Sequence, residues 1–156
     1  SGINRGDNSS VSVHYSGTLG AVFEACMKEE PAIGFSVRST APDCDFSPYE
    51  QTILDIASLA MKKDFPRDVC LNVNFPIVEK LRGVRVCRLA RGNWVEDWIG
   101  AGDADTFRLT GHFVNLEPEA DDTDDWVLCH GMAAVTPLKL DMTHYPTIPL
   151  LKELES

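Results

Sequence analysis

The sequence predicts an α/β fold in which helices pack on a mainly parallel sheet, with an antiparallel hairpin arm added in the second half. Segments of helical periodicity alternate with short apolar strands up to about residue 76, and this order is typical of a parallel sheet covered by helices. After Gly83 the pattern changes to alternating apolar and polar residues with Gly-rich breaks, which predicts the arm. With 156 residues, of which 44% are hydrophobic, the chain is long enough for one packed domain.

The first helix is expected after a polar loop over residues 1–16. Its apolar residues recur at spacings of three and four and form one continuous face: Leu19, Val22, Phe23, Cys26 and Met27. Ser16 or Thr18 can cap its amino terminus, and Pro31 ends it. A short buried strand is then expected over residues 32–37.

The second helix has the strongest boundary signals in the chain. Ser47 is expected as its cap, with Pro48 at the first helical position and Glu50 completing a capping box. Its buried face is expected to consist of Ile53, Ile56, Ala57, Ala60 and Met61. A strand over residues 69–75 follows and ends at Pro76.

Beyond residue 83 the chain is expected to form an arm and then to return to the core. Apolar and polar residues alternate at Val84 and Val86 and again over residues 107–113, which predicts antiparallel strands. The single domain is therefore expected to consist of residues 1–83 in the α/β core, residues 84–117 in the antiparallel arm, and residues 118–156 as a returning core strand and carboxy-terminal tail.

The acidic run from Glu117 to Asp125 is expected to be a solvated turn, not a metal site. Its last two members, Asp124 and Asp125, lie in the first turn of a short predicted helix, where carboxylates favour the helix dipole. A strand over residues 133–138 and a short Leu-rich helix after Pro146 complete the expected order.

The charge and the cysteine content argue against several classes of protein. The 24 acidic and 14 basic residues give a net charge of -10, which disfavours binding of a nucleic-acid polymer because a phosphate backbone requires clustered Lys and Arg. The absence of a run of 18 apolar residues disfavours a membrane span. The five cysteines are widely separated and form no C-x-x-C pair, which indicates a reducing, cytoplasmic location.

The loop at the start of the chain carries the residues best suited to chemistry. Asn4 and Asn8 would project beyond the carboxyl end of a strand, where ligands bind in doubly wound sheets. Ser16, Gly17 and Thr18 open the first helix, and their hydroxyl and backbone N–H groups suit a phosphate. Purely structural roles remain open, since Asn8 can be a turn residue and either hydroxyl can be a plain helix cap.

Several short motifs occur in one order along the chain. They are S-G-I-N-x-G-x-N (1–8), Y-S-G-T-L-G-A (15–21), L-N-V-N-F-P (71–76), R-G-V-R-V (82–86), T-D (123–124) and V-T-P-L-x-x-D-x-T (135–143). Together they resemble the SurE family of 5'-nucleotidases over essentially the whole chain. The resemblance implies a three-layer α/β/α, Rossmann-like fold and a divalent-metal-dependent phosphatase that hydrolyses nucleoside monophosphates.

The resemblance also implies roles for single residues. Asn4 would be a metal ligand, and Asn8, Ser16, Gly17 and Thr18 would line the phosphate site. The metal would be Mg²⁺ or Mn²⁺, because hard cations prefer oxygen ligands. No residue is assigned as the catalytic group.

One departure from the family pattern concerns the acidic metal ligands. The Asp-Asp pair that helps to hold the metal in the resembled family has no counterpart in this chain. We therefore expect the chain to correspond to the carboxy-terminal two-thirds of such a protein, with the natural polypeptide extending upstream. A non-catalytic nucleotide-binding or assembly module is the alternative. An unrelated α/β hydrolase is disfavoured because no G-x-S-x-G elbow is present.

The aromatic residues of the arm leave two roles open. Trp94, Trp98 and Trp126 are candidates for stacking on a nucleobase, but the first two lie in the arm, where subunit packing is the alternative. An isolated hairpin is marginally stable in water. We therefore expect the arm to pack on another subunit, in a homodimer or homotetramer.

Overall fold

The central sheet determines where every other element lies. The computed structural model describes residues 1–95, 98–100, 102 and 105–155. Within those ranges the sheet has five strands in the order β1-β2-β3-β9-β4. They are β1 (Asn4–Arg5), β2 (Ile33–Val37), β3 (Val69–Phe75), β4 (Val84–Val86) and β9 (Ala133–Lys139). Strands β1, β2 and β3 are parallel to one another, whereas β9 runs antiparallel to β3. The predicted α/β fold with a mainly parallel sheet is confirmed.

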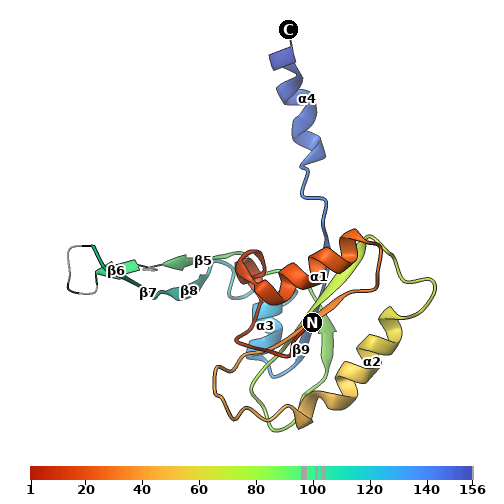
Figure 1. Ribbon diagram of the computed structural model, residues 1–156, viewed down its shortest axis with the longest axis vertical. Coiled ribbons are helices and arrows are strands. Elements are labelled where there is room, and N and C mark those ends of the chain that lie inside the picture. Colours follow the sequence, from red (N-terminus) through yellow and green to blue (C-terminus); the bar gives the residue numbers. More distant parts are fainter. Residues whose placement is uncertain (96–97, 101, 103–104, 156) are drawn as a thin grey trace.

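Alternation along β3 sorts its side chains onto the two faces of the sheet. Leu71, Val73 and Phe75 are buried in the cluster that includes residues of α2 (Glu50–Ala60). Cys70 lies on the opposite face, in the cluster formed with α1 (Gly17–Met27). Helix α3 (Asp124–Cys129) packs beside β9 in a further cluster. Helices therefore cover both faces of the sheet, as Figure 1 shows.

Phe75 lies at the centre of the α2 face. Its side chain is fully buried, and its ring lies 4.6 Å from that of Tyr49 and 6.3 Å from that of Phe35, stacked in both cases. Stacked aromatic rings add to the free energy that their burial already contributes. The carboxyl end of β3 is thereby held against the segment that leads into α2.

The two long helices begin in different ways. Of the two candidate caps, Ser16 and Thr18, Ser16 caps α1, because its Oγ accepts a hydrogen bond of 3.1 Å from the Leu19 N–H. The capping box predicted for the second helix is wrong. Ser47 belongs to a 3₁₀ turn that precedes α2, and its own N–H and hydroxyl donate to the Asp45 carboxylate. The hydroxyl that the S-x-x-E pattern assigns to capping is therefore engaged with Asp45, and the cap position of α2 has no side-chain hydrogen bond.

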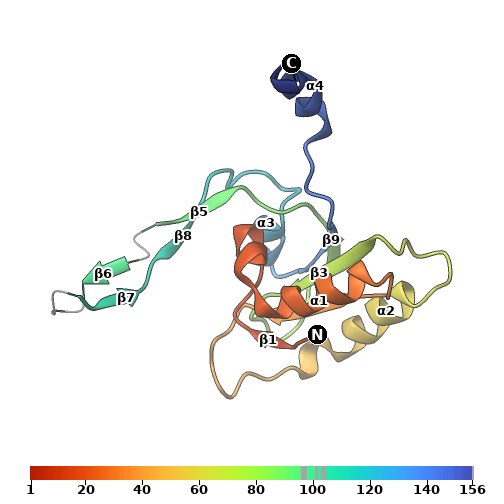
Figure 2. The same cartoon turned by 45° about the horizontal axis from the view of Figure 1, so that its top comes forward.

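The arm is an antiparallel ribbon that projects from the body (Figures 1 and 2). Its strand pairs are β5 (Gly92–Val95) with β8 (His112–Asn115), and β6 (Trp98–Gly100) with β7 (Phe107–Leu109). The expectation that Val84 and Val86 belong to this ribbon is wrong, because β4 pairs in parallel with β9 in the central sheet. Alternation indicates a strand but carries no information about its partner, which explains the error.

The carboxy-terminal tail forms short helical turns away from the sheet (Figure 2). They are a 3₁₀ turn (Tyr145–Thr147), α4 (Ile148–Leu151) and a second 3₁₀ turn (Lys152–Glu155). Leu150 and Leu154 are largely exposed there. In the part of the chain that the structure describes, no helix has the length and apolar character needed to cross a bilayer.

We predict that Phe75→Ala destabilises the protein by about 3–5 kcal/mol, because it removes a buried ring and leaves a cavity between two others. The free energy of unfolding is measured by urea titration followed by circular dichroism. Val86→Ala, at a position that is 70% exposed, is the control and should change stability by less than about 0.5 kcal/mol. Equal effects of the two substitutions would contradict this account of the core.

Candidate functional site

The loop from Gly6 to Ser16 lies beyond the carboxyl ends of the parallel strands. It leaves β1 at Gly6, whose N–H donates to the carbonyl oxygens of Val37 and Ser39 at 3.0 and 2.8 Å. Gly6 has a φ of +98°, a conformation that glycine adopts without a steric penalty. The loop is thus turned back over the sheet at the edge where α/β folds bind ligands.

A network of buried amides holds Asn8 in place. The Asn8 N–H donates to Asn74 Oδ1 at 2.7 Å, and its Nδ2 donates to Ser36 Oγ at 2.6 Å. Asn72 Nδ2 donates to the Asn8 carbonyl at 2.8 Å, and Asn74 Nδ2 donates to Asn72 Oδ1 at 3.1 Å. Asn72, Asn74 and Ser36 are fully buried. The N-x-N spacing on β3 therefore has a physical reason, since two strand residues on one face supply the polar partners of a single loop residue.

A second anchor joins the loop to α3. Ser10 has a φ of +52°, which is uncommon for a residue other than glycine. Its N–H donates to Asp124 Oδ2 at 2.8 Å, and its hydroxyl donates to the carbonyl of Ala90 at 2.7 Å. The other carboxylate oxygen of Asp124 accepts from the N–H groups of Ala90 and Asp125 at 2.8 and 2.9 Å. This carboxylate therefore links three distant segments of the chain.

The expectation of a solvated acidic turn is wrong at Asp124. Its side chain is fully buried. Burial raises the pKa of the Asp124 carboxyl above its ordinary value, and the three backbone N–H donors offset part of that rise. Asp121 and Asp122 do lie at the surface, where they pair with Arg85 and Arg88. The acidic composition of the run could not distinguish the buried Asp124 from the exposed Asp121 and Asp122. The difference arises because backbone N–H groups from distant segments bind the Asp124 carboxylate.

Arg38 is a further residue at this edge, and the predicted site did not include it. It follows β2 directly, and its Nη2 lies 2.8 Å from Asp7 and 2.7 Å from Asp125. The same guanidinium donates to Ser9 Oγ at 3.4 Å. Arg38 therefore ties the loop to α3 from a third direction. The sequence feature that could have identified Arg38 is its position one residue after a predicted strand.

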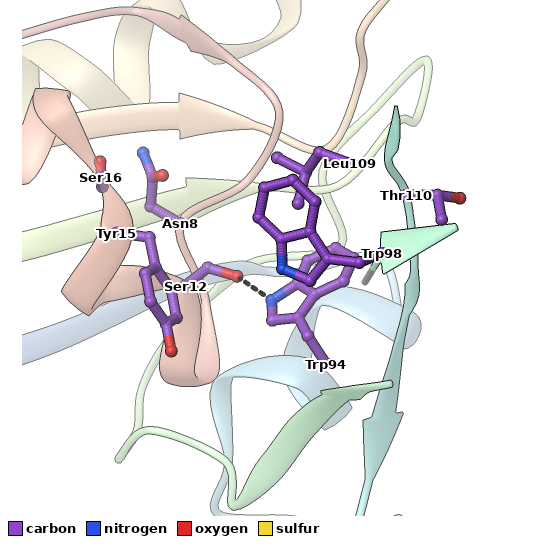
Figure 3. A pocket seen from close by; sticks show the side chains of 8 residues that line it. All are labelled: Asn8, Ser12, Tyr15, Ser16, Trp94, Trp98, Leu109 and Thr110. Atoms are coloured by element: carbon purple, nitrogen blue, oxygen red, sulfur yellow. Dashed lines mark hydrogen bonds between the residues drawn. The ribbon is translucent and has the colours of Figure 1, made fainter. Parts of the chain in front are cut away.

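The loop and the arm enclose a pocket of about 500 Å³. Its lining residues are Asn8, Ser12, Tyr15, Ser16, Trp94, Trp98, Leu109 and Thr110. Figure 3 shows Asn8 and Ser16 on one side and the indole rings of Trp94 and Trp98 on the other. Trp94 Nε1 donates to Ser12 Oγ at 3.3 Å, which joins the arm to the 3₁₀ helix of the loop (Ser10–Tyr15).

The predicted site residues occupy different places around this pocket. Asn8 and Ser16 both line it. Gly17 and Thr18 form the first turn of α1, where backbone N–H groups have no acceptor within the helix. Asn4 lies in β1 outside the lining, and its Nδ2 donates to the Gly6 carbonyl at 2.6 Å. Because a carbonyl can only accept, the Asn4 amide oxygen must point away from Gly6.

The described residues do not form a complete metal site. Among them, no group of three or more His, Cys, Asp and Glu side chains is arranged to hold a metal ion. The Asn4 amide oxygen is a suitable single ligand for a hard cation, but such a cation requires about six oxygen ligands. Water and one amide would leave its charge without carboxylate compensation.

Comparison with known proteins relates the chain to one family. A family model described as survival protein SurE matches residues 1–96. A protein of Phocaeicola vulgatus named 5'-nucleotidase SurE is 46% identical over 154 residues, which cover 97% of this chain and 60% of that protein. Its namesake in Bacteroides thetaiotaomicron is 47% identical over 147 residues, covering 92% of this chain and 57% of that protein.

A solved structure shows the same similarity. The crystal structure of SurE protein from Aquifex aeolicus superposes with a TM-score of 0.79 at 29% sequence identity, covering 99% of this chain and 64% of that one. The chain thus spans about 60% of the length of the curated relatives that it matches.

We predict that Asp124→Asn destabilises the protein by about 1–3 kcal/mol, because an amide places an NH₂ group against backbone donors that a carboxylate accepts. Asp121→Asn is the matched control, since Asp121 lies in the same acidic run but is largely exposed, and it should change stability little. Both free energies of unfolding are measured at neutral pH. A loss at Asp121 as large as that at Asp124 would show that the run acts through its summed charge.

Proposed function

Because the chain belongs to the survival protein SurE family, we propose that the protein is a 5'-nucleotidase, a metal-dependent phosphomonoesterase that hydrolyses nucleoside monophosphates to nucleoside and phosphate. The observation that carries the proposal is the joint position of Asn8 and Ser16 in the wall of one pocket. The names of the relatives support the activity.

We propose that the phosphate binds between Asn8 and the amino terminus of α1. The Ser16 Oγ accepts from Leu19, so its hydroxyl proton remains available to a phosphate oxygen. Gly17 and Thr18 supply backbone N–H groups at the positive end of the helix dipole. Asn8 Nδ2 uses one N–H for Ser36 and retains a second one. These neutral donors allow a chain of net charge -10 to hold an anion locally.

These groups would act on phosphoryl transfer by position and charge. Catalysis of this reaction depends chiefly on orienting the phosphoryl group and stabilising the charge on its oxygens. Donors that the buried asparagine network and the helix hold in place need no reorganisation during the reaction. Asn8 and Ser16 would therefore bind and orient the phosphate oxygens. No residue of the chain is assigned as the nucleophile or the general acid.

We further propose that Asn4 supplies one oxygen ligand to a divalent cation, Mg²⁺ or Mn²⁺. Bound metal would supply Lewis-acid polarisation of the phosphoryl oxygens. The proposal rests on the orientation of the Asn4 amide, which the Gly6 carbonyl determines. The described residues provide no acidic ligand set beside it, and we derive no reaction step from the cation.

A non-catalytic nucleotide-binding or assembly module is the second candidate. The observation that favours it is the lack of a group of acidic or histidine ligands among the described residues. Binding of a nucleoside monophosphate without release of phosphate, in the presence of Mg²⁺ or Mn²⁺, would support this candidate over the enzyme.

The assembly and the location of the protein are part of the proposal. The arm exposes Ile99 and Phe107 to 45% and 63%, and burying these side chains between copies in a homodimer or homotetramer would remove apolar surface from water. The cysteines at 26, 44, 70, 87 and 129 are all free thiols, which supports a cytoplasmic location. We propose neither a nucleic-acid polymer nor a membrane as a partner.

We predict that Ser16→Ala lowers kcat/KM for a nucleoside monophosphate by about 10²-fold, the cost typical of losing one preorganised donor. Phosphate release by the full-length protein is measured over a panel of nucleoside monophosphates, with and without divalent metal. Undiminished turnover by the wild type in excess chelator would contradict metal dependence.

Two control variants separate binding from helix capping. Ser16→Asp keeps the cap, because Asp caps helices as well as Ser, but it places a negative charge against the phosphate. Its thermal stability should equal that of the wild type while activity is lost. Ser47→Ala, on an exposed 3₁₀ turn, should leave kcat/KM unchanged. Full activity of Ser16→Asp would exclude the phosphate site placed here.

We predict that Asn4→Ala raises the concentration of Mg²⁺ or Mn²⁺ required for half-maximal activity by at least about tenfold, since changes around metal ligands typically cost 10–100-fold in affinity or activity. The measurement is a metal titration of phosphate release by the full-length protein. Asn93→Ala, at an exposed position of the arm, is the control. An unchanged titration of Asn4→Ala would remove Asn4 from the ligand set.

A further inference from the structure

We propose that Trp98, supported by Trp94, forms an aromatic wall on which the base of the nucleotide stacks, so that the arm completes the substrate site. This inference rests on the proposed function, since it names the part of the substrate that the phosphate-binding residues do not contact. The arm would then determine which phosphate esters bind well, in addition to any role in assembly.

The pocket is chemically divided along its length. Asn8 and Ser16 provide hydrogen-bonding groups on the side of the loop, whereas Trp94, Trp98 and Leu109 provide apolar surface on the side of the arm (Figure 3). A volume of about 500 Å³ is within the range of small-molecule sites. A ligand that suits both sides has an anionic group at one end and a flat aromatic group at the other. A nucleoside monophosphate meets this description.

Trp94 is held in place from two directions. It lies opposite Phe113 in the ribbon, and the two rings meet edge-on at 6.3 Å between centroids. Its indole N–H donates to Ser12 Oγ at 3.3 Å. These contacts restrain the ring and still leave it 43% exposed. A restrained and partly exposed indole can bind a base without first being ordered, which lowers the entropic cost of stacking.

Trp98 offers the more open of the two rings. It lies opposite Leu109 in the ribbon, and both side chains line the pocket. Trp98 is 63% exposed, so the ring has room for a planar partner. Stacking of a base on an aromatic side chain is worth enough to change affinity by roughly 5- to 150-fold, and every base has a face that can stack.

Subunit packing explains the exposure of Trp94 and Trp98 less well than that of other apolar residues of the arm. Ile99 and Phe107 also lie on the arm and are 45% and 63% exposed, but neither lines the pocket beside Asn8 and Ser16. Those side chains are free to contact another copy of the chain. Trp94 and Trp98 are the arm tryptophans that contact the pocket itself.

The third tryptophan, Trp126, packs against other side chains of the protein and provides a matched control. Trp126 stacks on His130 with 3.6 Å between ring centroids, and the Arg85 guanidinium lies 5.3 Å from its ring. Protein groups thus already contact its indole, and it does not belong to the pocket lining. Its substitution changes the tryptophan content without changing the pocket.

The test is equilibrium binding of adenosine, adenosine 5'-monophosphate and inorganic phosphate to the full-length protein by calorimetry. Trp98→Ala should weaken binding of adenosine and of the monophosphate by about tenfold and leave the binding of inorganic phosphate unchanged. Trp98→Phe should retain most of the affinity, because it keeps an aromatic face. Trp126→Phe should bind all three ligands as the wild type does. Light scattering of each variant monitors assembly.

Two results would overturn the inference. One is unchanged binding of adenosine by Trp98→Ala. The other is loss of the oligomer with equal weakening for adenosine and inorganic phosphate, which would assign Trp98 to subunit packing. Adenosine has no phosphate to release, so its binding is independent of the phosphatase. Absence of phosphate release together with Trp98-dependent binding of adenosine would refute the enzymatic proposal and leave the stacking wall in place.

Discussion

The position of the whole site depends on satisfying two amides buried in the sheet. Asn72 and Asn74 are fully buried on β3, and a buried amide without hydrogen-bond partners costs free energy that a domain of this size can hardly lose. Their partners are each other and the backbone of Asn8. These hydrogen bonds fix where the loop passes over the end of the sheet. Because α1 follows the loop directly, they also position the amino terminus of α1.

Asp124 and Arg38 connect the loop to other parts of the molecule. Asp124 joins Ser10 to Ala90, just before the arm begins, and Arg38 joins Asp7 to Asp125. The loop, the base of the arm and α3 are therefore held as one unit, although they lie far apart in the sequence. A pocket between loop and arm keeps its shape only if both walls share anchors, and Asp124 is one anchor common to both.

This architecture separates the tasks of the proposed site. Backbone and side-chain donors around Asn8 and Ser16 are suited to an anion, whereas the indoles of Trp94 and Trp98 are suited to a planar apolar group. The two kinds of surface come from different structural units, a loop restrained by the sheet and a ribbon that projects from it (Figure 1). Under this proposal, specificity for the organic part of a substrate is set in the arm, apart from the groups proposed to hold the anion.

The sequence by itself determined the features that depend on neighbours along the chain. Periodicity located α1 and the strands β2 and β3, Ser16 was one of two candidate helix caps, the ordered motifs along the chain identified the family, and the loop around Asn4 and Asn8 gave the candidate site. Only the tertiary structure decided that β4 pairs with β9, that Asp124 is buried while Asp121 is exposed, and that Trp98 shares a pocket with Asn8. The reason is physical: Asn8 meets Asn74 across 66 positions and Ser10 meets Asp124 across 114, and a hydrogen bond over such a separation leaves no trace in local periodicity or composition.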